Sequence, residues 1–305
     1  MKTKTHFAMK RFLLSIGMLV ALASPALATF HEMQIEQVIG GVDGDPTAQA
    51  IQLRMRVPGQ TMVSEAKLVA FDATGSNPIT ILDLTTDVTQ GAAGSRILIV
   101  SSNFVNYASP TVVPDFILTT PIPSNYLAAG RLAWEQDTGT IYWSLSWGGT
   151  NYTGDNTGIP LNDDNGNFGP AFGGPLPSTS TKALLFTNTF GAVSRSNIVD
   201  YVVTVGAAAF TNNNGAGFVV VSKPPLVTAI TQESANIRIT WRTIAGRTNV
   251  VQFTGGDTSG NYTNSFVDLT GPIIVTGSGQ VVTNYLDAGG ATNFPSRYYR
   301  VRLVP

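Results

Sequence analysis

Apolar and polar residues alternate in several short stretches of the chain, which is the pattern of half-buried β-strands. Residues 51–57 read IQLRMRV, in which every second side chain is apolar and the others are Gln or Arg. Residues 236–241 (NIRITW) and 298–303 (YYRVRL) repeat this alternation, with Trp241 on the apolar face of the first. The pattern predicts three strands, each with one face on a core and one face in solvent.

Other stretches are continuously apolar and predict strands buried on both faces: KLVAF at 67–71, ITILDL at 79–84 and RILIVSS at 96–102. No segment after residue 28 keeps a 3.6-residue period, although NYLAAGRLAWEQ at 125–136 accommodates a helical turn. Val, Ile and Thr are frequent in the predicted strands and Gly and Asn between them, which is typical of strands joined by turns. The sequence therefore predicts an all-β protein.

A Pro-Pro pair at 224–225 interrupts the pattern, because proline supplies no backbone donor and favours an extended linker. We expect two β-sandwich domains of the immunoglobulin-like kind in tandem. The first covers residues 29–221 and carries a long polar loop near 148–180. Residues 222–225 form the linker, and residues 226–305 form the second domain.

The first 28 residues have the three parts of a secretory signal peptide. A basic start is followed by the uncharged run 12–23 and then by Ala26-Leu27-Ala28, a small-x-small cleavage site. Twelve residues are too few to span a bilayer, which takes about twenty, and no other long apolar run follows. We therefore expect export to the periplasm, cell surface or medium, with no transmembrane anchor in the mature chain.

Net charge limits the kinds of partner this chain can bind, and cysteine content limits how it can be stabilised. Removing the four basic residues of the signal peptide leaves 14 Lys and Arg against 19 Asp and Glu, a net charge of −5. Such a chain lacks the basic surface that nucleic acid requires. The chain has no Cys, so cores rather than disulfides must stabilise it outside the cell.

The chain lacks the residue types that several common catalytic sites require. His6 and His31 are the only histidines, which argues against Ser-His-Asp, Cys-His and His/Cys zinc sites. Two carboxylate pairs, Glu135 with Asp137 and Asp163 with Asp164, could serve a glycosidase. Both lie in turn-like sequence, which is more typical of solvated loop carboxylates.

The stretch 141–154, IYWSLSWGGTNYTG, concentrates aromatic residues. A period of two places Trp143 and Trp147 on the same face as Ile141 and Leu145, which predicts a core strand rather than a sugar-binding platform. Tyr142 and Tyr152 remain the weak candidates for ligand-binding surface aromatics.

The segment 154–169, GDNTGIPLNDDNGNFG, is rich in the oxygen ligands that Ca²⁺ prefers. The weak calcium candidates are Asp155, Asp163, Asp164 and Asn165. The EF-hand spacing fails, because Leu161 would occupy the first ligand position, and Asp and Asn are also ordinary turn residues. GGVDGDPT at 40–47 is a still weaker cation candidate, so no cofactor other than Ca²⁺ is expected.

Two family resemblances cover nearly the whole mature chain. MQIEQVIGGVDGDPTAQAIQLRMR (33–56) and YLAAGRLAWEQDTGTIYWSLSWGG (126–149) make residues 31–221 resemble the lamin-tail-like immunoglobulin sandwich of bacterial exported proteins of uncharacterised function. ANIRITWRTIAGRTNVVQFT (235–254) and PSRYYRVRLVP (295–305) make residues 226–305 resemble a fibronectin type III-like sandwich. The resemblances imply modules that bind, space or attach, usually without catalysis, and they transfer no functional residue to this chain.

We therefore expect a non-enzymatic, exported protein of the cell surface or envelope that binds a glycan or an envelope protein. The alternative is a secreted carbohydrate-active enzyme or its glycan-binding accessory module. A third interpretation gives residues 226–305 a role in surface sorting or attachment.

Overall fold

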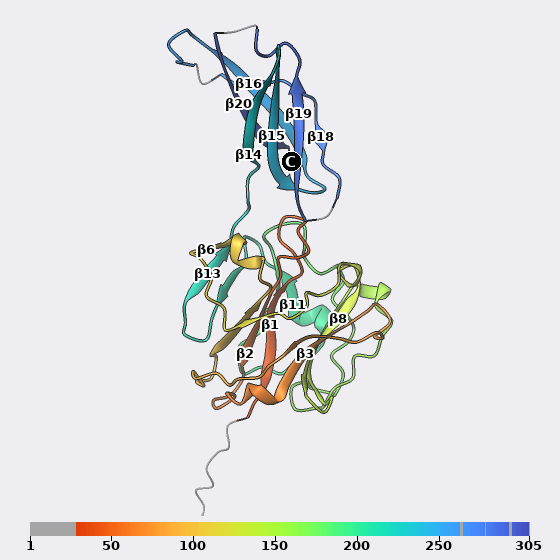
Figure 1. Ribbon diagram of the computed structural model, residues 1–305. Helices are drawn as coiled ribbons and strands as arrows, with labels where there is room; N and C mark the ends of the chain where they lie inside the picture. Colours follow the sequence, from red (N-terminus) through yellow and green to blue (C-terminus); the bar gives the residue numbers. More distant parts are fainter. Residues whose placement is uncertain (1–28, 263–264, 278, 293–294, 305) are drawn as a thin grey trace, which may run out of the picture.

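The computed structural model describes residues 29–262, 265–277, 279–292 and 295–304, so the predicted signal peptide lies outside the described residues. The all-β prediction is confirmed. Figure 1 shows a larger body formed by residues 29–221 (the N-terminal region) and a narrower one formed by 226–304 (the C-terminal region), joined by one extended segment. Among the described residues, no helix combines the length and apolar character needed to cross a membrane.

Three sheets build the N-terminal region. Their orders are β11-β10-β1-β2-β5-β7, β4-β3-β8-β9 and β12-β13-β6, and the pairing is antiparallel except between β5 and β7. The elements are β1 (Met33–Ile39), β2 (Ala50–Met55), η1 (Val63–Glu65), β3 (Ala66–Phe71), β4 (Ile79–Asp83), β5 (Arg96–Val100), η2 (Phe104–Tyr107), β6 (Ala108–Ser109), β7 (Phe116–Ile117), η3 (Ser124–Tyr126), β8 (Gly130–Gln136), β9 (Ile141–Trp147), η4 (Gly149–Asn151), β10 (Leu184–Phe186), α2 (Asn197–Asp200), β11 (Tyr201–Val203), β12 (Ala209–Thr211) and β13 (Gly217–Val220).

The six-stranded sheet is the middle layer, because both of its faces are covered. On one face, Leu53 of β2 joins Trp134 and Trp143 of the four-stranded sheet in one buried cluster. On the other face, Leu98 of β5 joins Phe210 of the three-stranded sheet in a second cluster. The alternating apolar residues of β2 and β5 therefore serve two different cores.

The third layer corrects one prediction from the sequence. Residues 51–55 lie in β2 (Ala50–Met55), but the polar face predicted for 51–57 is not solvated, since Gln52 and Arg56 are buried. Buried Glu36 on the neighbouring strand accepts hydrogen bonds from Gln52, Arg54 and Arg96, each at 2.7 Å. These charge-assisted bonds offset the cost of removing the polar groups from water.

The aromatic stretch 141–147 forms β9, and the prediction of a core strand is confirmed: Trp143 and Trp147 are fully buried. The second face of β9 is buried as well, because the polar segment after it folds back over the sheet. The Asn162 side chain donates to the Tyr142 carbonyl at 2.8 Å, and Phe172 N donates to the Ser146 carbonyl at 2.9 Å. The helical turn expected within 125–136 is the short 3-10 helix η3, and β8 follows it.

Two smaller sheets build the C-terminal region. One has the order β14-β15-β19, and in the other β16 pairs with β17, β18 and β20. Ile239, Trp241 and Val251 form a compact buried core, so the apolar face predicted for residues 236–241 is confirmed. The strands are β14 (Leu226–Glu233), β15 (Asn236–Ile244), β16 (Thr248–Gly256), β17 (Val267–Asp268), β18 (Ile273–Ile274), β19 (Gln280–Asp287) and β20 (Ser296–Val304).

Candidate functional site

The segment 40–48, which we call the Gly/Asp loop, extends from the end of β1 to the base of the C-terminal region (Figure 1). Its turn uses left-handed backbone at Asp43 (φ 57°) and Gly44 (φ 87°), a conformation that Asp and Gly adopt more readily than other residues. Backbone hydrogen bonds from Asp43 N and Gly44 N to the carbonyls of Ser180 and Ser178 fix the loop at its base.

The Asp43 carboxylate joins three parts of the chain. It forms an ion pair with Arg247, in the turn between β15 and β16. It also accepts hydrogen bonds from Ser222 Oγ at 2.5 Å and from Lys223 N at 3.2 Å, both in the linker. Arg247 Nε additionally donates to the Asp43 carbonyl at 3.2 Å. One buried carboxylate thus joins the loop that carries it to the linker and to the C-terminal region.

Apolar contact reinforces this junction. Ile244 at the end of β15 is buried, and it belongs to the same cluster as Val42 and Ala48 of the N-terminal region. The two regions therefore share part of one hydrophobic core.

The second acid of the loop, Asp45, is also saturated with donors. It accepts from Thr47 Oγ1 at 2.6 Å, from Asn103 Nδ2 at 2.8 Å and from the Tyr107 hydroxyl at 2.9 Å. Burial and this bond to Asp45 raise the pKa of Tyr107. Both acids of the segment 40–47 thus accept hydrogen bonds from groups of the protein itself. The cation that pairs with this segment is Arg247. Sequence reasoning did not find this partner, which lies about two hundred residues away.

The structure places the two tyrosine candidates inside the N-terminal region. Tyr142 is 6% exposed, and its hydroxyl donates to Gln136 Oε1 at 3.0 Å. Tyr152 is 7% exposed, and its hydroxyl donates to the Asp155 carbonyl at 3.0 Å; burial raises its pKa. Neither offers the exposed ring that the sequence suggested, and the Tyr142 ring packs edge-on against Phe30.

Tyr152 nevertheless borders a hollow of about 470 Å³, whose lining also includes Thr150, Asn156 and Ile198. Asn156 Oδ1 is buried without a hydrogen-bond partner within the described structure. An unpaired buried acceptor is costly, and this one belongs to a residue that lines the hollow.

The four calcium candidates are not brought together. Asp155 accepts from Thr157 N at 2.9 Å and Thr157 Oγ1 at 2.5 Å, and these bonds lower the pKa of Asp155. Asp163 Oδ1 accepts from the backbone N atoms of Asn165 and Asn167, while the side chain of Asp164 is exposed. Across the described residues, no three acidic, His or Cys side chains gather as metal ligands. Asp163 Oδ2 is buried without a partner, but one oxygen falls far short of the six to eight that Ca²⁺ takes.

The carboxylate pair Glu135 and Asp137 is divided between two environments. Glu135 is buried on β8, and this burial raises its pKa, with Lys67 and Arg131 opposing the shift. Asp137 follows the strand in an exposed turn, where its carbonyl accepts from Lys67 Nζ at 2.9 Å.

No protein-family model, no curated protein and no solved structure matches this chain. The lamin-tail-like and fibronectin type III-like resemblances therefore stay predictions from the sequence.

Proposed function

We propose that this chain is a non-enzymatic, exported protein of the cell surface or envelope, with two tandem β-sandwich domains behind a cleaved signal peptide. Its role is to bind or to hold a glycan or another envelope protein. The observation that carries the proposal is the junction: Asp43, Arg247 and Ile244 tie the two regions together. A fixed orientation of two domains suits a protein that spaces or presents a surface.

The use made of the acidic residues supports a non-enzymatic role. Asp43, Asp155 and Asp163 accept hydrogen bonds from neighbouring turns and from the linker. Carboxylates engaged in this way hold loops in place and are poor general acids or bases. Glu135, with its raised pKa, is the carboxyl group on which a catalytic role would most readily rest.

The test is retention of residues 29–305 on envelope material and on a panel of insoluble polysaccharides, with product analysis of the same samples. We expect saturable retention on one component and no release of hydrolysed product. Hydrolysis that disappears in Glu135→Gln or Asp163→Asn would contradict the proposal and support the carbohydrate-active enzyme.

A glycan-binding accessory role is the second candidate, and the hollow beside Tyr152 favours it. Sugar recognition commonly combines apolar contact with a few precisely placed polar groups, and Asn156, which lines the hollow and has an unpaired Oδ1, could supply one. Asn156→Ala should then weaken retention on a polysaccharide about tenfold. Tyr142→Phe is the matched control, because its hydroxyl bonds Gln136 and does not line the hollow. Equal retention by both variants and the native protein would remove the hollow from consideration.

A further inference from the structure

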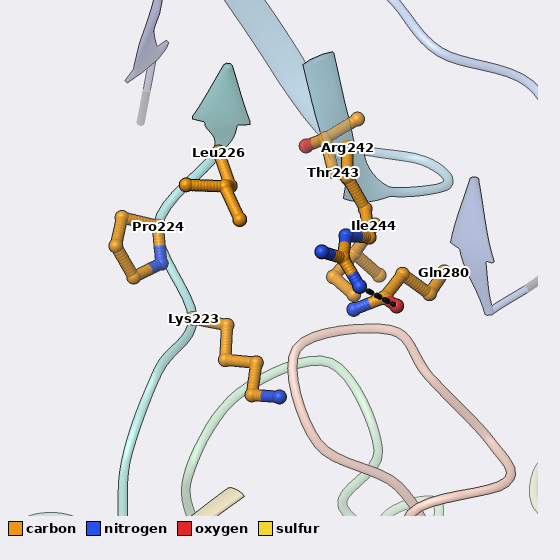
Figure 2. A pocket seen from close by; sticks show the side chains of 7 residues that line it. All are labelled: Lys223, Pro224, Leu226, Arg242, Thr243, Ile244 and Gln280. Carbon is orange, nitrogen blue, oxygen red and sulfur yellow. Dashed lines mark hydrogen bonds between the residues drawn. The ribbon is translucent and has the colours of Figure 1, made fainter. Parts of the chain in front are cut away.

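A second hollow lies where the linker meets the C-terminal region, and nothing in the proposed function requires it. It measures about 270 Å³ and we call it the junction hollow (Figure 2). Its lining comes from the linker, β14, β15 and the start of β19: Lys223, Pro224, Leu226, Arg242, Thr243, Ile244 and Gln280.

Two cationic side chains reach into the same space from different elements. In Figure 2 the Lys223 side chain extends from the linker, and the Arg242 guanidinium lies beside Gln280. Lys223 Nζ lies 5.1 Å from the centroid of the Tyr107 ring, and Arg242 Nη1 is 3.4 Å from Gln280 Oε1. The nearby carboxylate of Asp43 is already paired with Arg247.

Among the residues that the structure describes, the two cations lack a carboxylate partner, which most of the arginines have. Arg54, Arg96, Arg238, Arg247 and Arg302 each contact a carboxylate within 4 Å. In the part of the chain that the structure describes, Lys223 and Arg242 form no such ion pair. Two like charges that share one hollow repel each other, so an anion placed between them would be favoured by both.

The remaining lining is apolar. Leu226 is 54% exposed although it is a large aliphatic residue, and Pro224 lies beside it. Ile244 closes the hollow toward the N-terminal region, where it is buried. A ligand that covers Leu226 would remove apolar surface from water while its charged end meets the cations.

We propose that the junction hollow binds a small aliphatic carboxylate. The carboxylate would lie between Lys223 and Arg242, since the planar guanidinium matches the two oxygens of a carboxylate and the ammonium adds a point charge. The short hydrocarbon part would cover Leu226 and Pro224. The volume lies just below the usual range of about 300–1,000 Å³ for small-molecule sites, which favours a short free ligand over a folded partner.

The test is a titration of isotope-labelled residues 29–305 with hexanoate, followed by amide chemical shifts. We expect saturable shifts at the backbone amides of Lys223, Leu226, Ile244 and Gln280. Hexanamide, which has the same shape without the charge, should cause no saturable shift there. Higher salt should weaken hexanoate binding, because both cations are accessible to solvent ions.

Variants keep the test specific. Arg242→Gln and Lys223→Gln should each raise the Kd for hexanoate about tenfold or more. Arg238→Gln is the matched control on the same strand: Arg238 is paired with Glu233, outside the hollow, and its loss should leave the Kd unchanged. The proposal is overturned if hexanoate gives no saturable shift, if hexanamide binds equally well, or if Arg238→Gln weakens binding as much as Arg242→Gln.

Discussion

Two carboxylic acids of the N-terminal region show how the surroundings of a residue set its acidity. Glu135 is buried on β8, and burial raises its pKa above the ordinary value of 4.5. Asp72 is partly exposed in the turn after β3, and its pKa is lowered to about 2. The Thr74 hydroxyl, the Asn77 amide and Ser76 N all donate to its charged form.

These opposite shifts predict opposite effects of pH on two neutral substitutions. The folded state binds the Glu135 proton more tightly than the unfolded state, so ionised Glu135 destabilises the fold as the pH rises above its unfolded-state pKa. Glu135→Gln should therefore raise Tm relative to the native protein near neutral pH and lose that advantage near pH 4.

Asp72→Asn is the control of opposite sign. Its charged form is favoured in the folded state, so the native carboxylate stabilises above the unfolded-state pKa and loses this contribution as the pH falls toward about 2. The variant should lower Tm near neutral pH only. Thermal melts across the acidic range measure both effects, and a Glu135→Gln variant that melts lower than the native protein at every pH would contradict the account.

At the scale of elements, the sequence predicts well where the strands lie along the chain. It predicts poorly which other segments pack against them. Alternation located β2, β15 and β20, and continuous apolar runs located β3, β4 and β5. Alternation failed to predict the burial of Gln52, because the sheet that covers it includes residues 209–220, about 160 positions later. Likewise, the polar stretch after β9 has the sequence of a loop, and local sequence gives no sign that it bonds the backbone of Tyr142 and Ser146.

The same limit applies to the candidate site. Composition identified GGVDGDPT at 40–47 only as a weak cation candidate. It could not name Arg247, since an ion pair across two hundred residues depends on how two regions meet in space.

The loops of the 154–169 segment should behave as self-contained turns. Asp155, Asp163 and Asn165 each accept backbone hydrogen bonds from residues two to four positions later, so their oxygens are engaged without a metal. We predict that EDTA and millimolar Ca²⁺ give the same Tm. A rise of Tm with Ca²⁺ that Asp163→Asn abolishes would instead identify a calcium site.

At the scale of the whole molecule, charge is divided unevenly between the two regions. Residues 29–225 contain eight Lys and Arg against fifteen Asp and Glu, whereas residues 226–305 contain six Arg against four Asp and Glu. Opposite net charges attract at long range, but salt screens that attraction beyond about 10 Å. The buried contact of Asp43 with Arg247 is screened less and sets the orientation more strongly.

Arg247→Ala should therefore destabilise the protein substantially. It leaves the buried Asp43 carboxylate with only Ser222 and Lys223 N as partners, which we expect to lower the free energy of unfolding by about 2–3 kcal/mol. Arg238→Ala is the matched control, because its pair with Glu233 is exposed to solvent and should contribute little to stability. Denaturant unfolding measures both, and equal losses in the two variants would contradict a special role of Arg247.

The most direct test of the central claim, that the junction fixes the two regions as one unit, is a set of residual dipolar couplings from residues 29–305. We expect one alignment tensor to fit the amides of both regions in the native protein. In Arg247→Ala, the two regions should need separate tensors of unequal magnitude. Separate tensors in the native protein would contradict the claim, because they would mean that the regions reorient despite the contacts of Asp43 and Ile244.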